Sequence, residues 1–147
     1  MNGSHALIGL VVASLAIGCA ASPPTAPSSG TGALVPSTGQ LAGTWNLASI
    51  RPAGEAEQTT PSGASYTLTF ADDRLSTRAD CNICNGGFAL SGETLTAGPA
   101  LACTRAACPT MAFENAYTRA LGGQSTVTMS STTLVLSSER GVLRFTR

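Results

Sequence analysis

Two short cysteine motifs organise this chain: Cys81-Asn82-Ile83-Cys84 and Ala102-Cys103-Thr104-Arg105-Ala106-Ala107-Cys108. They hold four of the five cysteines in the 147-residue sequence. Four cysteines in an exported chain are most simply explained by two structural disulfides; a zinc site and a thioredoxin-like redox site are the alternatives. Zinc sites usually have tighter paired spacing, and no strand-to-helix junction of an α/β unit is visible at Cys84. We therefore expect disulfides, and no metal or other cofactor.

The pairing of these cysteines is not fixed by sequence, because four cysteines allow three connectivities. If segment 81–84 runs antiparallel to segment 103–108, Cys81 faces Cys108 and Cys84 faces Cys103, as an antiparallel register requires. Loop-closure entropy favours this nested arrangement, at about 6 kcal/mol for both bridges against about 4 kcal/mol for two local ones. We predict the nested pairing, Cys81–Cys108 and Cys84–Cys103.

The composition argues against an enzyme. All eight basic residues are arginines, and the only histidine is His5. A chain without lysine, and without histidine beyond its first residues, lacks the commonest general base, Schiff-base residue and metal ligand. The formal net charge of zero gives no electrostatic footprint for nucleic acid. We expect a non-enzymatic protein with no catalytic residues and no nucleic-acid partner.

The first 40 residues predict export and anchoring. Residues 1–19 resemble a lipoprotein signal peptide, with an apolar run that is too short to span a membrane and ends in Ala16-Ile17-Gly18-Cys19. In bacterial lipoproteins such a cysteine is lipidated, which would also account for the odd cysteine; the alternatives are an ordinary cleaved signal or a buried helix. The absence of Lys and Arg from residues 1–5 departs from the usual signal. Residues 20–40 are rich in Pro, Ser, Thr, Gly and Ala and predict an unstructured tether.

The remainder, residues 41–147, predicts one small domain. Period-2 alternation indicates strands at 41–47, 66–70, 75–79, 88–90, 93–96, 126–129, 133–137 and 142–146. One helix is expected to begin with Pro109 at its first helical position, with Phe113, Ala116, Tyr117, Ala120 and Leu121 on one face and Gly122-Gly123 at its end. The expected fold class is α+β, a small antiparallel sheet or partly closed barrel capped by one helix and held by the disulfides.

These motifs together resemble the META/HslJ domain. The resemblance rests on Leu41-Ala-Gly-Thr-Trp45-Asn-Leu47, Cys81-Asn82, Gly87-Phe88, Thr104-Arg105-Ala106-Ala107-Cys108, and Glu114, Tyr117 and Leu121, and it covers residues 41–147. It implies a compact α+β domain, often borne by bacterial envelope lipoproteins and linked to heat shock and antibiotic resistance without an established activity. Two features depart from the family: Asp80 replaces the usual glycine, and Cys84 and Cys103 form an additional pair, which supports their mutual bonding.

Three residues beside the disulfides form a candidate binding loop: Asp80, Asn82 and Arg105. The alternative interpretation is that Asn82 caps a turn and that the charges, with Arg78, are solvated surface pairs. Trp45 follows Gly-Thr as in the first strand of lipocalins, but a core tryptophan is the simpler explanation, and a domain of this length barely supplies the eight strands of a lipocalin barrel. Glu114 is expected to complement the helix dipole.

Three functions follow as hypotheses. The first is a monomeric, lipid-anchored envelope lipoprotein that supports envelope integrity, stress response or antibiotic resistance through an envelope protein partner. An Asp directly after the lipidated cysteine would resemble an inner-membrane retention signal, but Ala20 stands there. We therefore expect the protein to be anchored in the outer membrane and to face the periplasm. The second is a lipocalin-like binder of a small ligand. The third is an exported hydrolase inhibitor that presents the cross-linked loop to a cleft.

Overall fold

The computed structural model describes residues 35–147 as ten strands and two helices. The expected signal peptide, the lipidation site Cys19 and most of the expected tether lie outside the described residues. Within residues 35–147, no helix is long and apolar enough to cross a membrane. The elements are α1 (Thr38–Leu41), β1 (Gly43–Pro52), β2 (Gln58–Thr59), β3 (Tyr66–Ala71), β4 (Arg74–Ala79), β5 (Asn82–Ser91), β6 (Thr94–Ala97), β7 (Ala102–Cys103), α2 (Met111–Leu121), β8 (Gly123–Met129), β9 (Thr133–Ser138) and β10 (Gly141–Thr146).

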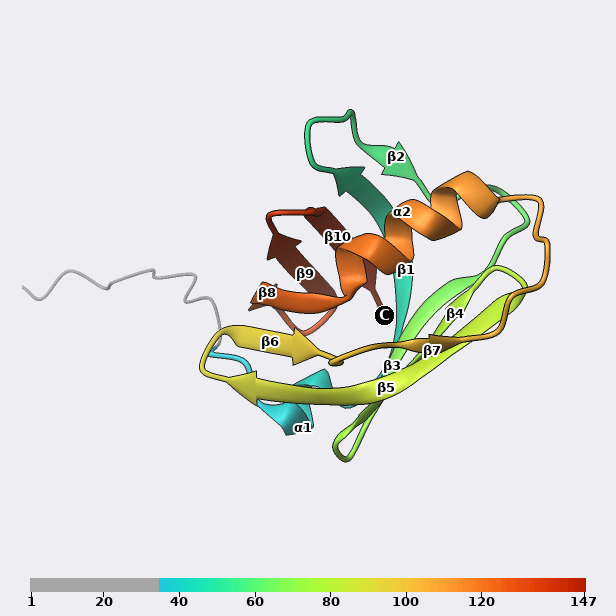
Figure 1. The fold of residues 1–147 in the computed structure, drawn as a ribbon. Helices are drawn as coiled ribbons and strands as arrows, with labels where there is room; N and C mark the ends of the chain where they lie inside the picture. The colour runs from blue at the N-terminus through green and yellow to red at the C-terminus, as the bar shows by residue number, and fades with distance from the viewer. Residues whose placement is uncertain (1–34) are drawn as a thin grey trace, which may run out of the picture. The chain divides into compact units, whose positions relative to one another are not determined.

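Eight of the strands form a closed antiparallel barrel in the order β1-β3-β4-β5-β6-β8-β9-β10, with β10 pairing back to β1 (Figure 1). The two short strands lie outside this circuit, β2 on β1 and β7 on β5. The expected α+β sheet or partial barrel is therefore corrected to a mostly-β closed barrel. The expectation that a domain of this length barely supplies eight strands was also wrong, because tight turns leave few residues between strands.

The long strand β1 closes the barrel because it changes partners along its length. Its first residues pair with β3, from Gly43 opposite Phe70, and its later residues pair with β10, up to Pro52 opposite Gly141. An irregularity in register between Leu47 and Ser49 lies where β1 runs along β10, and such bulges bend a strand and increase its twist. Closure thus depends on the second half of β1, which continues to Pro52, beyond the strand expected at 41–47.

The barrel interior is filled by side chains from the alternating positions that sequence periodicity predicts. The buried cluster includes Trp45, Leu68, Phe70, Leu136 and Phe145, each at most 2% exposed. Complete burial of side chains of this size is the main stabilising contribution in a small domain, worth about 1.5–3 kcal/mol for each aliphatic or phenylalanine side chain. The interior is therefore a packed core and not a wide ligand chamber.

Helix α2 packs against β1, β4 and β10 and lies across the barrel (Figure 1). Its buried face carries Phe113 and Tyr117, whose rings meet the Tyr66 ring edge-on at centroid distances of 5.0 and 5.4 Å. The Tyr117 hydroxyl lies 2.6 Å from Oγ1 of Thr77. The expected helical face is confirmed, but Pro109 does not occupy the first helical position: Thr110 is the N-cap residue and Met111 begins the helix.

A helical turn, α1, precedes the barrel where the sequence predicted tether up to residue 40. Ser37 and Gln40 form a capping box that starts this turn, and the Leu41 carbonyl accepts a 2.8 Å hydrogen bond from Nε1 of Trp45. The Arg147 guanidinium lies 4.0 Å from the centroid of the Trp45 ring and donates to the carbonyl of Ala42. The chain is thus ordered before residue 41 because Trp45 of β1 and Arg147, the residue after β10, both donate hydrogen bonds to backbone carbonyls of α1.

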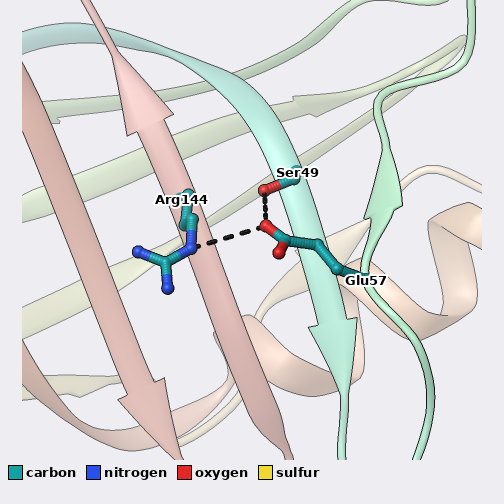
Figure 2. A network of polar contacts seen from close by, with 3 residues as sticks. All are labelled: Ser49, Glu57 and Arg144. Atoms are coloured by element: carbon teal, nitrogen blue, oxygen red, sulfur yellow. Dashed lines mark hydrogen bonds and ion pairs between the residues drawn. The ribbon is translucent and has the colours of Figure 1, made fainter.

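A polar network fixes the segment between β1 and β2 to the last strand. Glu57 accepts a hydrogen bond from the hydroxyl of Ser49, and its Oε1 lies 3.4 Å from Nε of Arg144 (Figure 2). Ser49 and Arg144 are register partners on β1 and β10. The side chains of Arg144 and Glu57 are about half exposed, so this pair contributes little energy, about 0–1 kcal/mol, and its role is to position β2 beside the closure.

Candidate functional site

Two disulfides attach the segment before α2 to the start of β5. Cys81 is bonded to Cys108 and Cys84 to Cys103, with Cα–Cα distances of 5.8 and 4.0 Å. This is the nested connectivity that was predicted. The antiparallel register assumed for it is present, because Cys84 faces Cys103 directly in the β5–β7 ladder. We call residues 101–110 the stapled segment. Each disulfide closes a loop in the unfolded chain and so lowers its conformational entropy, which is expected to stabilise the folded domain.

The buried Asn82 side chain holds the stapled segment in place through hydrogen bonds. It is 1% exposed, and its Oδ1 accepts hydrogen bonds from the Ala106 amide at 2.8 Å and the Thr104 hydroxyl at 2.9 Å. Its Nδ2 donates to the Ala106 carbonyl at 3.0 Å. The carboxamide therefore bonds to the loop as a neighbouring backbone segment would, and it fixes a loop that has little secondary structure of its own. This role corresponds to the interpretation of Asn82 as a turn cap.

The same Asn82 amide contacts a buried carboxylate. Its Nδ2 lies 2.9 Å from Oε1 and 3.1 Å from Oε2 of Glu114, which is only 7% exposed. The expectation that Glu114 simply complements the helix dipole missed this burial. The signal was present in the sequence, because Glu114 stands three residues before Tyr117 and seven before Leu121, on the face that packs inward.

Of the other two residues of the candidate loop, Arg105 lines the same cleft as Asn82, whereas Asp80 does not. Asp80 Oδ2 accepts a 2.7 Å hydrogen bond from the hydroxyl of Thr110, and Arg78 Nε donates to the Asp80 carbonyl rather than to its carboxylate. Arg105 is exposed, and the only ion pair within residues 35–147 joins Arg144 to Glu57. The expected charged cluster is therefore not formed.

A chain of hydroxyl groups connects Asp80 to the aromatic core. Thr110 uses its single hydroxyl proton on Asp80, so the Tyr66 hydroxyl, 2.7 Å away, donates to Thr110. Burial raises the pKa of Tyr66; the Thr110 hydrogen bond opposes this, and the nearby charges of Asp80 and Glu114 add to it. Burial raises the pKa of Tyr117 above its ordinary value, with the Thr77 hydrogen bond opposing. Both phenols stay neutral at physiological pH.

A cleft of about 290 Å³ lies between the stapled segment and α2. The buried residues Asn82 and Glu114 line this cleft. Its exposed lining includes Thr104 and Arg105 from the stapled segment and Met111 and Asn115 from α2. Met111 is one of three large apolar side chains exposed on the described part of the chain, at 41%. Residues 35–147 contain no group of three His, Cys, Asp or Glu side chains placed to hold a metal ion.

Solved structures of similar fold are known. An NMR structure of a protein from Burkholderia xenovorans is 29% identical and superposes with a TM-score of 0.61, covering 84% of this chain and 97% of that one. A second NMR structure is 22% identical, with a TM-score of 0.61 and coverages of 76% and 94%. A lipocalin-like protein from Bacteroides uniformis is 18% identical, with a TM-score of 0.50 and coverages of 74% and 98%. The last two show the fold alone.

Family comparison agrees with the resemblance of the cysteine, tryptophan and helix motifs. No curated protein sequence matches the chain. The family model described as the META domain matches residues 39–147, which span the barrel, the stapled segment and both helices apart from the first residue of α1. Since this match covers well over half of the sequence, the chain belongs to the META domain family.

Proposed function

We propose that this chain is a lipid-anchored, non-catalytic domain of the cell envelope that binds a partner protein through the stapled segment. The observation that carries the proposal is that residues 102–107 are exposed and yet fixed by two disulfides and the Asn82 carboxamide. A surface loop held in one conformation loses little conformational entropy on binding. Such a loop is therefore suited to recognition of a macromolecule.

The lipid anchor and the compartment rest on the sequence before the barrel. The pattern ending at Cys19 favours lipidation, and disulfides favour an oxidising compartment. Ala20 in place of Asp favours the outer membrane. We expect labelled palmitate to be incorporated into the wild-type chain and not into Cys19→Ala, which would leave the membrane fraction. An unchanged membrane fraction for the variant would contradict anchoring at Cys19.

A lipocalin-like role in small-ligand binding is the second candidate, favoured by the eight-stranded barrel and its similarity to a lipocalin-like fold. The packed interior weighs against it, because Trp45, Phe70 and Phe145 are buried in the space that a ligand would need. Inhibition of a hydrolase is a special form of the partner-binding proposal, in which the stapled segment enters a catalytic cleft. Assays against lysozymes and secreted proteases test that form.

Site-specific photocrosslinking in the envelope tests partner binding. A photoreactive amino acid at Arg105, on the stapled segment, is expected to yield a discrete adduct with one protein. The same amino acid at Glu139, in the exposed turn between β9 and β10, is the matched control and is expected to give none. Absence of an adduct at position 105, or the same adducts at both positions, would overturn the proposal.

A further inference from the structure

The Glu114 carboxylate has more hydrogen-bonding capacity than the described chain uses. Its two oxygens can accept about four hydrogen bonds, yet both are contacted by one donor atom, Nδ2 of Asn82. Nδ2 carries only two hydrogens and also donates to the Ala106 carbonyl. The first turn of α2 favours a negative charge through its dipole, but neither carboxylate oxygen accepts from another group within residues 35–147.

The charge of Glu114 also has no cationic partner in this part of the chain. Arg105 lines the same cleft but forms no ion pair, and the ion pair of residues 35–147 lies elsewhere, at Arg144 and Glu57. A buried charge is costly unless it is paired. Glu114 lines the cleft rather than the closed core, so a group that enters the cleft can supply the missing charge.

From this arrangement we propose that the cleft receives an arginine side chain of the partner protein, whose guanidinium pairs with Glu114. The inference rests on the proposed partner binding and names the chemistry of the contact. A planar guanidinium can bond both oxygens of one carboxylate, which an ammonium does less well. The exposed residues Met111 and Asn115 line the same cleft and can contact the aliphatic stem.

The size and composition of the cleft select this occupant over others. The cleft, at about 290 Å³, lies at the lower limit of pockets for whole small molecules, about 300–1000 Å³, and has room for one long side chain. A metal ion would need more ligands than one carboxylate, and no suitable group exists among the described residues. The chain's own first 34 residues contain neither Arg nor Lys, so they cannot supply a guanidinium.

The test uses the oxidised full-length chain in non-ionic detergent, labelled at the methionine methyl groups. The sequence has three methionines; Met111 lines the cleft and Met129, 5% exposed, is an internal control in the core. The probe is N-acetyl-arginine methylamide, and its neutral isostere N-acetyl-citrulline methylamide is the matched control. We expect saturable shifts of the Met111 methyl and the Asn82 side-chain amide with the arginine probe, no change at Met129, and about ten-fold weaker binding of the citrulline probe.

Two variants keep the test decisive. Glu114→Gln is expected to weaken the arginine probe about ten-fold, whereas Glu93→Gln, at an exposed turn, leaves it unchanged. If Glu114→Gln does not fold, Thr118→Arg places a guanidinium four residues after Glu114 on α2, where it can pair with the carboxylate. That variant is expected to be more heat-stable and to lose probe binding. Equal binding of both probes, or binding unaffected by either variant, would overturn the inference.

The outcomes separate this inference from the proposed function. If crosslinking from position 105 captures the same partner in wild type and Glu114→Gln at equal yield, partner binding stands and the arginine contact is refuted. If wild type captures no partner, the proposed function fails even where the probe binds. Concentration-dependent dimerisation that Glu114→Gln abolishes would assign the arginine to a second copy of this chain and overturn a separate partner.

Discussion

The side-chain amide of Asn82 lies 2.9 Å from the carboxylate of Glu114, so a loop anchor on β5 and a buried charge on α2 form one unit. Asn82→Asp removes the donor and places a second carboxylate beside the first. We expect a loss of about 3 kcal/mol or more in the free energy of unfolding at neutral pH, because a buried charge then has no partner. Asn85→Asp, on the same strand but exposed, is the control, and an equal effect of both variants in urea denaturation would contradict this assignment.

The contact between Arg147 and Trp45 links the last strand to the first turn of the domain. Arg147→Gln removes a cation–π contact at 4.0 Å and a hydrogen bond to the Ala42 carbonyl. We expect about 1–2 kcal/mol of destabilisation and a changed emission of Trp45, the only tryptophan. Arg74→Gln, at an exposed position of β4, should change neither. Fluorescence-monitored denaturation measures both quantities together, and an unaltered emission maximum would show that the contact is not maintained in solution.

Local patterns predicted most of this fold because each strand is short and alternates cleanly. Leu68 and Phe70, or Leu143 and Phe145, stand two residues apart and are buried, as period-2 reading requires. Barrel closure was not predictable in this way, since it depends on the pairing of Pro52 with Gly141, two residues far apart in sequence. Pairing of distant strands is decided by tertiary packing, and the strand expected at 41–47 ended before the second half of β1.

The candidate site divides in the same manner. The sequence allowed three cysteine pairings, and the nested one was predicted from an assumed antiparallel register and from loop-closure entropy; the structure has this pairing. The Asn82–Glu114 contact joins a strand to a helix 32 residues later, and no spacing rule predicts such a contact. Asp80 and Arg105 were grouped with Asn82 because all three lie close to cysteines in sequence. The structure places Arg105 on the same cleft as Asn82, whereas the Asp80 carboxylate pairs with Thr110.

Removal of either disulfide should weaken the domain without unfolding it. The two bridges close loops with sequence separations of 27 and 19, so Cys81→Ala/Cys108→Ala and Cys84→Ala/Cys103→Ala are each expected to cost about 2–4 kcal/mol. Each variant is the matched control of the other. Non-reducing digestion and mass spectrometry should yield only the two nested cross-linked peptides. A peptide with an internal 81–84 bridge would contradict the connectivity.

The two tyrosines should make the domain sensitive to alkali. Burial raises the pKa of both Tyr66 and Tyr117 above the ordinary value near 10. A raised folded-state pKa gives stability that is complete below about pH 10 and is lost as the pH rises toward the folded-state pKa, at up to about 1.4 kcal/mol per pH unit for each phenol. Tyrosinate absorbance should therefore appear in one cooperative step with unfolding. The guanidinium-denatured chain is the control and should titrate near pH 10; a native chain that titrates there while still folded would refute the burial argument.

Gly141 marks the point where the barrel closes, and its lack of a side chain is required there. Its φ is +141°, and a Cβ atom would collide with the Arg51 carbonyl oxygen and lie 3.0 Å from Cα of Pro52. Both atoms belong to the β1 backbone and cannot move without separating β1 from β10. Gly141→Ala is therefore expected to cost about 2–4 kcal/mol from strain and overlap and to increase hydrogen exchange of the β1–β10 amides more than those of β3–β4. Gly39→Ala, in the open surroundings of α1, should be neutral or slightly stabilising. If Gly141→Ala slowed exchange at β10 or left it unchanged, closure would not depend on this close approach.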